Sequence, residues 1–277
     1  MIKDFSLKSS LNNILNVTFY GIEKISYEPC LIFVHGFKGF KDWGFIPFLA
    51  KHFADNGYCV ITFNFSHNGI GKNQFELTEM DKFSKNTISL EVNELLDLIN
   101  AYKSGYFGNV FGKIGIIGHS RGGAVALISS LKSRGVNCYC VWASVSKLDR
   151  YTERQKKEWR KKGFIEIINS RTNQILKIDV EVLNDIEQII KGPDNIEAAV
   201  KKLKKPLLII HGEQDLTVPI AEGLQLYDWS DKKITKFVKI PGAGHTFDIV
   251  HPFKHSNLKF NKVLSESLIF FNQYLKN

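Results

Sequence analysis

The amino-acid sequence predicts an α/β protein whose mostly parallel sheet is covered by helices on both faces. Short, almost wholly apolar runs recur along the chain, as at 31–34 and 206–210. Strands that are buried on both faces have this composition, because neither face of the sheet meets water. Longer amphipathic segments separate the runs, and such alternation is typical of parallel sheets. With 277 residues, of which 44% are hydrophobic, the chain can bury one large core.

The expected elements follow one another in a regular order. Antiparallel edge strands are expected within residues 11–28, where the run 16–20 favours a strand. Buried strands are expected at 30–35, 58–63, 113–118, 138–144, 206–211 and 234–240. Helices are expected at about 44–56, 84–103, 121–134, 219–228 and 256–276. In the second of these, one face carries apolar side chains at helical spacing: Ile88, Val92, Leu95, Leu96 and Ile99.

Residues 147–204 interrupt this alternation and are expected to form a helical cap, inserted into a core of residues 1–146 and 205–277. Asp179 is a potential N-cap for the first cap helix. A lid over the site is favoured over a simple packing element, because ligands bind at the carboxyl ends of the strands, which such caps overhang. Two apolar stripes at helical spacing support the prediction: Val182, Leu183, Ile186, Ile189 and Ile190, then Ile196, Ala199, Val200 and Leu203.

The pentapeptide Gly118-His119-Ser120-Arg121-Gly122 matches the G-x-S-x-G pattern of a nucleophile elbow. It lies between the strand expected at 113–118 and the helix expected at 121–134. A serine on so sharp a turn has its hydroxyl pushed above the sheet, and flanking glycines prevent a Cβ from colliding with the neighbouring strand and helix. Because the pattern also occurs by chance, its position between strand and helix is what makes Ser120 the candidate nucleophile.

Two later turns provide the candidate partners of Ser120. Asp215 follows the apolar run 206–210, and His245 follows the run 237–240, so that Ser, Asp and His each stand just beyond a predicted strand. A serine hydroxyl needs a base to become a nucleophile, and His245 is assigned that role. Asp215 is expected to orient the imidazole. The rival carboxylates for this position are Glu213, Asp248 and Asp149.

With the upstream motif His35-Gly36-Phe37 added, the chain resembles the α/β-hydrolase family. More narrowly, it is similar to the cinnamoyl/feruloyl-esterase-like and serine-aminopeptidase-like branch. The resemblance covers nearly the whole chain except the middle segment. It implies a serine hydrolase acting through an acyl-enzyme, with the main-chain N–H groups of Phe37 and Arg121 forming the oxyanion hole.

Several substrate classes remain open within this resemblance. The leading expectation is hydrolysis of a carboxylic ester of small or aryl acyl type. The alternative is a peptidase, aminopeptidase-like or prolyl-oligopeptidase-like, or a thioesterase using the same three residues. A non-catalytic binding module is disfavoured, because the serine, aspartate and histidine are all intact. A single glycine precedes Phe37, unlike the Gly-Gly-Gly loop of some lipases, which disfavours esters of bulky tertiary alcohols.

Four more side chains are expected near the site. His119 is expected to support the elbow and His35 to hydrogen-bond the oxyanion loop, whereas His67 and Trp159 are candidate substrate contacts. Dinucleotide-binding and metal-binding patterns are not found in the sequence, so no cofactor and no metal are expected.

The formal net charge of +9 raises the question of an anionic partner. Residues 147–205 carry 15 basic and 10 acidic side chains, but no nucleic-acid-binding pattern accompanies them. Attraction of an anionic substrate is the alternative to a solvated basic surface. No membrane segment or signal peptide is expected, and four cysteines in predicted core strands favour the reducing cytoplasm. The expected partner is a small-molecule ester; nucleic acid and membranes are not expected partners, and the oligomeric state is left open.

Overall fold

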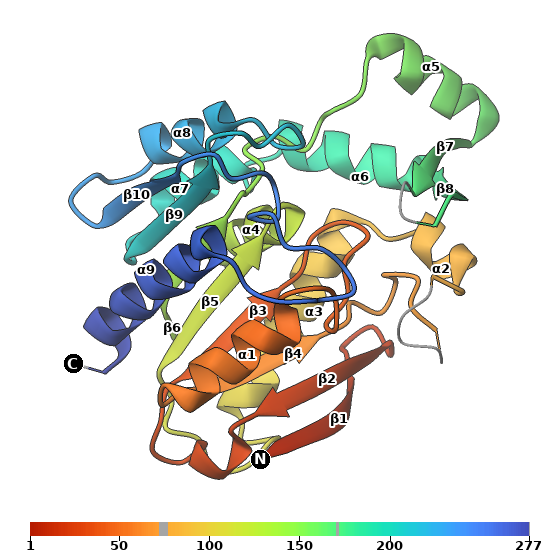
Figure 1. The fold of residues 1–277 in the computed structure, drawn as a ribbon. Helices are drawn as coiled ribbons and strands as arrows, with labels where there is room; N and C mark the ends of the chain where they lie inside the picture. Colours follow the sequence, from red (N-terminus) through yellow and green to blue (C-terminus); the bar gives the residue numbers. More distant parts are fainter. Residues whose placement is uncertain (72–76, 170–171, 277) are drawn as a thin grey trace.

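An eight-stranded sheet forms the centre of the molecule (Figure 1). The structure, a computed structural model, describes residues 1–71, 77–169 and 172–276. The strands of the sheet are β1 (Ile2–Lys8), β2 (Ile14–Tyr20), β3 (Cys30–Val34), β4 (Cys59–Phe63), β5 (Ile114–His119), β6 (Val136–Trp142), β9 (Leu207–Gly212) and β10 (Thr235–Ile240). Their order is β1-β2-β4-β3-β5-β6-β9-β10. The last six in that order are parallel, and β1 and β2 pair antiparallel at one edge.

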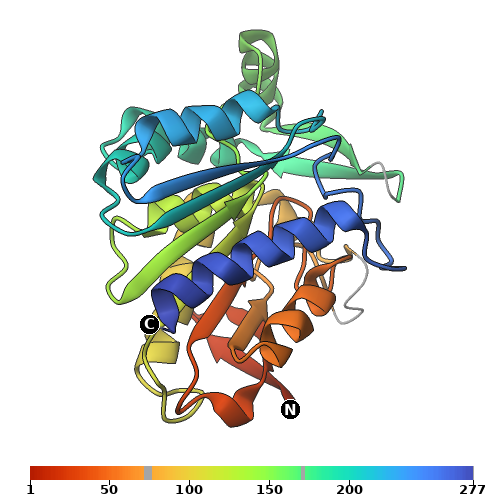
Figure 2. The ribbon, with the colours of Figure 1, turned by 60° about the vertical axis from the view of Figure 1, so that its left-hand side comes forward.

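Helices cover both faces of this sheet, as Figure 2 shows. One face packs against α1 (Ile46–Asp55) and α9 (Leu258–Leu275). The other packs against α3 (Ile88–Lys103), α4 (Arg121–Ser129), α7 (Ile196–Lys202) and α8 (Ile220–Trp229). Successive strand residues point to opposite faces, so in β5 Ile116 enters the α3–α4 core while Ile117 enters the α1–α9 core. This alternation explains why the central strands are apolar at nearly every position.

The predicted α/β fold class is confirmed, and the buried strands and their helices lie within a few residues of their predicted positions. The antiparallel edge of the sheet differs from the prediction. Only β2 lies within 11–28; its antiparallel partner β1 precedes that range, and residues Ile22–Lys24 form a 3₁₀ turn instead of a strand. The solvent-facing residues of β1 make it more polar than the buried strands, which is why the apolar pattern did not indicate it.

The segment predicted as a helical cap also contains a β-hairpin. The segment comprises α5 (Glu153–Lys162), β7 (Phe164–Asn169), β8 (Gln174–Asp179), α6 (Val180–Lys191) and α7. The hairpin strands β7 and β8 pair antiparallel, and they bury Leu176 and Ile178 on one face while Ile175 stays exposed. Only α5, the hairpin and α6 overhang the core, because α7 packs against α4 and α8 (Figure 1). A purely helical cap is therefore not what forms here.

Acidic side chains of the cap bind the core beneath it. Asp185 on α6 accepts hydrogen bonds from the main-chain N–H groups of Ile88 and Ser89, at 2.8 and 3.1 Å. These N–H groups lie at the N-terminus of α3, where the helix has no internal acceptors for them. Asp179 stands at the N-cap of α6 as predicted, but its side chain accepts a hydrogen bond from Ser84 of α2 (Met80–Ser84) at 3.0 Å instead of capping its own helix. Both contacts hold the cap over the sheet.

No helix within the described residues is long and apolar enough to cross a membrane. The four cysteines, Cys30, Cys59, Cys138 and Cys140, are buried in the core with free thiols. Burial raises the pKa of the Cys140 thiol to about 12, although hydrogen bonds with Ser267 and Trp142 act in the opposite direction. These thiols are core residues and take no part in the site described next.

Candidate active site

Ser120 occupies a sharp turn between β5 and α4. Its backbone has φ 57° and ψ −124°, a conformation that residues with a Cβ rarely adopt. The turn is held by its main-chain hydrogen bonds, since the N–H of Ser120 donates to the carbonyl of Trp142 at 2.9 Å and its own carbonyl accepts from Gly123 at 3.0 Å. Strain of this kind persists only where the surroundings impose it. It places the hydroxyl above the carboxyl end of the sheet, as the elbow pattern predicts.

The glycines that flank Ser120 are required by close packing. A Cβ at Gly122 would lie 2.3 Å from the carbonyl oxygen of Val34 and 2.4 Å from that of His35. A Cβ at Gly118 would lie 2.6 Å from the carbonyl oxygen of Gly122. All three distances are far below van der Waals contact, so α4 can approach β3 this closely only with hydrogen at these positions.

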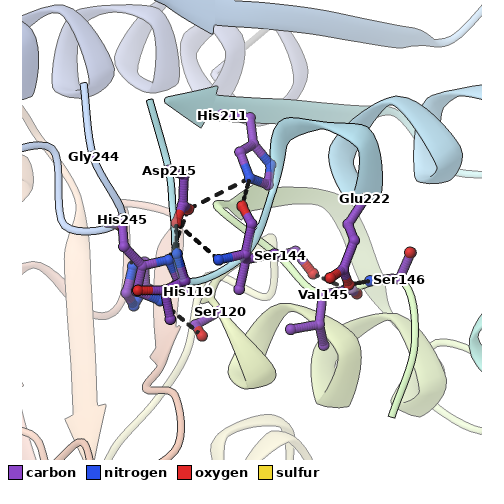
Figure 3. Close-up of polar contacts among 12 residues, drawn as sticks. His119, Ser120, Ser144, Val145, Ser146, His211, Asp215, Glu222, Gly244 and His245 are labelled. Atoms are coloured by element: carbon purple, nitrogen blue, oxygen red, sulfur yellow. Dashed lines mark hydrogen bonds and ion pairs between the residues drawn. The ribbon is translucent and has the colours of Figure 1, made fainter. Parts of the chain in front are cut away.

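His245 lies between Ser120 and Asp215 (Figure 3). Its Nε2 is 3.0 Å from Ser120 Oγ, and its Nδ1 is 2.8 Å from Asp215 Oδ2. The three side chains come from turns that follow β5, β9 and β10, which all end at the same edge of the sheet. Since the carboxylate accepts from Nδ1–H, Nε2 is left as the acceptor for the serine proton. The imidazole thus lies within hydrogen-bond reach of both the serine hydroxyl and the carboxylate.

The carboxylate of Asp215 is buried and fully hydrogen-bonded. Its Oδ1 accepts from the main-chain N–H groups of Thr217 and Val218 at 2.9 and 2.8 Å, and His211 Nε2 lies 3.5 Å from Oδ2. Burial by itself raises the pKa of Asp215, but the hydrogen bonds from His211 and His245 outweigh it and hold the pKa well below its usual range. Asp215 is therefore an anion throughout the neutral range and can stabilise a positive charge on His245.

None of the three rival carboxylates forms a hydrogen bond or an ion pair with the His245 ring. Asp248 accepts from the N–H of Gly244 at 3.0 Å and forms an ion pair with Lys259 at 2.5 Å. Asp149 forms an ion pair with Lys156, and Glu213 is exposed. Asp215 is thus the carboxylate that contacts the imidazole, which agrees with the assignment made from its motif.

Two further histidines support the loops of the site. His119 Nε2 lies 3.0 Å from the carbonyl oxygen of His245, and His35 Nδ1 lies 3.0 Å from the carbonyl oxygen of Gly36. Burial, the largest cause in each case, lowers the pKa of His119 to about 3 and that of His35 to about 4. Both rings are therefore neutral at physiological pH and act as hydrogen-bonding supports, as the sequence predicts.

The side chain of Arg121 links the elbow to the loop that follows β3. Its guanidinium lies over the ring of Phe37, 4.5 Å from the centroid, and forms an ion pair with the buried Glu91 of α3. The ring of Phe37 in turn stacks on that of Phe83 at 5.5 Å. Burial raises the pKa of Glu91, while the charge of Arg121 and a hydrogen bond from Asn86 oppose this rise. Sequence reasoning had assigned a role only to the main chain of Arg121.

Two cavities meet at Ser120 and His245. The smaller has a volume of about 200 Å³ and its lining includes Phe33, Trp43 and Phe45; we call it the aromatic cavity. The larger has a volume of about 330 Å³ and lies between the core and the cap. Its lining includes four cationic side chains, Lys38, Arg121, Lys147 and Arg150, and we call it the basic cavity. Both cavities therefore reach the same serine and histidine side chains.

The two predicted substrate contacts lie elsewhere. His67 lines neither cavity; its Nδ1 is 2.7 Å from Ser66 Oγ, which also contacts the buried Glu94. Trp159 is buried inside the cap against Tyr151, with ring centroids 4.9 Å apart, and only Tyr151 reaches the basic cavity. The cap turns Trp159 inward because α5 has few other apolar side chains to bury. Within the described residues, no group of three or more His, Cys, Asp or Glu side chains could hold a metal ion.

Sequence reasoning missed Glu91, Lys147 and Arg150 as residues of the site. Glu91 is three residues from Ile88 and four from Leu95, so it falls on the apolar face of α3, where a charged residue indicates a buried ion pair. Lys147 and Arg150 lie in the segment that follows β6, which ends at Trp142, on the side of the sheet where the site forms. Both signals were present in the sequence, but their partners come from distant segments.

A mostly parallel eight-stranded sheet with a serine elbow and a histidine–aspartate pair at the carboxyl ends of its strands defines the α/β-hydrolase class of proteins. The comparison with known families agrees, because residues 31–254 match the model of the alpha/beta hydrolase family. The chain belongs to this family.

Curated relatives are similar along most of their length. A 2-hydroxy-6-oxo-6-(2'-aminophenyl)hexa-2,4-dienoic acid hydrolase of Metapseudomonas resinovorans is 26% identical over 263 residues, which cover 84% of this chain and 83% of that protein. A Mycoplasma genitalium protein, whose name assigns it provisionally to the esterases and lipases, is 26% identical over 264 residues, with 87% and 90% covered.

Among solved structures, Est1E from Butyrivibrio proteoclasticus with bound ferulic acid has a TM-score of 0.74 at 18% identity, and 98% of each chain is covered. At this level of identity the likeness concerns the fold alone.

The neutral, buried histidines predict a loss of stability on acidification. The folded-state pKa of His119 is about 3, whereas that of an unfolded histidine is about 6.5. Between these values the unfolded chain binds a proton that the folded chain does not, so the free energy of unfolding falls as the pH falls, by up to about 1.4 kcal/mol per pH unit for each such group. His119→Gln should therefore reduce the slope of unfolding free energy against pH between about pH 4 and 6.5, measured by urea denaturation.

His35→Gln provides a second variant for the same measurement, because the folded-state pKa of His35 is about 4. Glutamine keeps a side-chain donor at both positions but does not titrate. Slopes equal to that of the unmodified protein in both variants would contradict the account of these two histidines.

Proposed function

We propose that this protein is a serine esterase, which hydrolyses carboxylic esters of small or aryl acyl type through an acyl-enzyme. One observation carries the proposal: a single imidazole, that of His245, lies 3.0 Å from Ser120 Oγ and 2.8 Å from the buried carboxylate of Asp215. Membership of the α/β-hydrolase family and the similarity to an esterase-named relative support the hydrolytic chemistry. The substrate partner is a small-molecule ester.

In the first half of the reaction, Ser120 Oγ attacks the ester carbonyl carbon while His245 Nε2 takes its proton. The imidazolium formed is stabilised by the anionic Asp215, whose lowered pKa keeps it from accepting the proton itself. His245 then donates the proton to the departing alcohol as the carbon–oxygen bond breaks. In the second half, His245 takes a proton from water as the water oxygen attacks the acyl carbon. It then gives this proton to Ser120 Oγ as the bond between the acyl carbon and Oγ breaks, so that the acid leaves and the serine hydroxyl is restored.

The oxyanion of the tetrahedral intermediate is assigned to the main-chain N–H groups of Phe37 and Arg121. Arg121 is the first residue of α4, and its N–H stands at the positive end of the helix. Phe37 follows Gly36, where an added Cβ would lie 2.9 Å from Ser120 Cβ, so the loop after β3 reaches the nucleophile closely. The contact between Arg121 and Phe37 keeps the two donors together.

The sizes of the two cavities support small or aryl groups as substrate. Volumes of about 200 and 330 Å³ suit an aromatic ring or a short chain on each side of the ester. The aromatic rings of the smaller cavity can pack against an aryl group. A long lipid chain would extend beyond both cavities.

Peptidase and thioesterase activities use the same three residues and are the alternatives. An amide asks more of the site than an activated ester, because its amine must be protonated as it leaves. A cytoplasmic location is part of this proposal, supported by four buried cysteines with free thiols.

The first test concerns the nucleophile. A fluorophosphonate should modify Ser120 covalently, and Ser120→Ala should abolish both labelling and ester turnover, because no other described hydroxyl contacts His245 Nε2. Mass spectrometry of the labelled peptide identifies the residue. Ser144→Ala is the matched control, since Ser144 lies close by in Figure 3 but donates to the carbonyl of Val145. Labelling that persists in Ser120→Ala would move the nucleophile elsewhere.

The second test concerns the carboxylate. Asp215→Asn should lower kcat by about 10³- to 10⁴-fold, because the amide favours the wrong tautomer of His245. Asp248→Asn is the control: Asp248 is on the same loop as His245 but binds Gly244 and Lys259, so its kcat should stay within about threefold of the unmodified enzyme. The assignment of Asp215 would be wrong if the two variants behaved the other way round.

The third test concerns the acyl group. Acetyl, butyryl and feruloyl esters of one phenol should have higher kcat/KM values than the palmitoyl ester of that phenol. Their kcat/KM values should also be higher than those of aminoacyl and prolyl amides that share one aryl amine. The expectation follows from the size of the cavities at Ser120. Faster cleavage of the amides would establish the peptidase alternative, and preference for palmitoyl would exclude the small-acyl assignment.

A further inference from the structure

The basic cavity differs chemically from the aromatic cavity, although both are lined by Ser120 and Lys38. Four of its lining side chains are cations, Lys38, Arg121, Lys147 and Arg150, and none of its described lining residues is an aspartate or glutamate. Apolar side chains of the cap, Ile178 and Val182, close it from above. Charges beside an apolar wall are less screened than charges in open solvent, so this cavity favours a negatively charged occupant.

We propose that the basic cavity binds a carboxylate of the substrate, so that the preferred ester carries a negative charge on the side of the ester bond that enters this cavity. The inference rests on the proposed esterase function and specifies its substrate class. Half-esters of dicarboxylic acids and esters of hydroxy acids have this structure.

The two arginines of the cavity are held in place by glutamates outside its lining. Glu222 Oε1 accepts from both terminal nitrogens of Arg150 at 2.8 Å, and its Oε2 accepts from the N–H of Ser146 at 2.9 Å. Glu91 of α3 accepts a hydrogen bond from one terminal nitrogen of Arg121 and forms an ion pair with it. Cations oriented by partners behind them lose little freedom when a ligand binds in front, which favours recognition of an anion.

Lys147 and the Nε of Arg121 are left without a partner among the described residues. Lys147 is exposed and forms no ion pair with a described carboxylate. Arg121 Nε is buried and has no hydrogen-bond partner among the described residues, so a donor on a lining side chain is left unsatisfied. A neutral group filling the cavity would desolvate these cations without replacing the lost interactions. A carboxylate of the same shape would compensate the loss.

Matched pairs of esters test the inference on each side of the bond. On the acyl side, mono-4-nitrophenyl adipate is compared with 4-nitrophenyl adipamate, in which a neutral amide replaces the carboxylate. On the alcohol side, 4-acetoxybenzoate is compared with 4-acetoxybenzamide. At low salt, the acid of one pair should have a kcat/KM at least about tenfold above that of its amide, and 0.5 M salt should reduce the ratio.

Variants of Lys147 identify the cavity as the origin of the preference. Lys147→Gln should lower the acid-to-amide ratio by about fivefold, the factor expected for an ion pair of an exposed lysine, and Lys147→Glu should lower it further. Lys157→Gln is the matched control, because it removes the same charge from an exposed cap position that lines neither cavity. The ratio of this control should equal that of the unmodified enzyme.

The outcomes separate this inference from the proposed function. Equal kcat/KM values for acid and amide in both pairs would overturn the carboxylate assignment, while hydrolysis of the amide-capped esters would still support the esterase. A preference for the acids that persists in Lys147→Glu would also overturn it, since the charge would be recognised elsewhere. Failure to hydrolyse any of the four esters would instead overturn the esterase function itself.

Discussion

The backbone of Ser120 is the constraint on which the rest of the site depends. Its positive φ is imposed by tight packing on both sides, where α4 approaches β3 closely enough to exclude any Cβ at Gly122. The strained conformation persists because the eight strands and their helices bury a large core around it. The strain is confined to one residue, whereas the packing that stabilises the fold involves the whole core.

Around this turn, the carboxylate of Asp215 is buried, whereas the cationic side chains line the basic cavity. The anion nearest the imidazole, Asp215, is buried and holds two main-chain hydrogen bonds besides its contact with His245, so its position is determined before a substrate arrives. The cations lie closer to the cavity, with Glu91 and Glu222 behind two of them. Preorganised groups of this kind act without reorganisation during the reaction, which is why an enzyme places them on rigid elements.

The fold and the Ser–Asp–His order were predictable because they depend on local patterns. Apolar runs indicate buried strands wherever they occur, and an elbow glycine such as Gly118 is required by its immediate neighbours. The same reasoning failed at β1, whose solvent-exposed residues weaken the apolar pattern, and at the hairpin of β7 and β8, which lies in a segment where helical stripes predominate. It also failed for Trp159, whose large apolar side chain packs inside the cap instead of facing a ligand.

By itself, the sequence determined the α/β class, the positions of the central strands and the candidate serine, histidine and aspartate, because each follows from residues within one strand and its turn. Only the tertiary structure decided that Asp215, and not Asp248, contacts His245, and that Arg121, Lys147 and Arg150 line one cavity. These outcomes depend on how separate strands end at one edge of the sheet and on where the cap lies. Contacts between segments far apart in the chain leave no spacing in the sequence from which they could be derived.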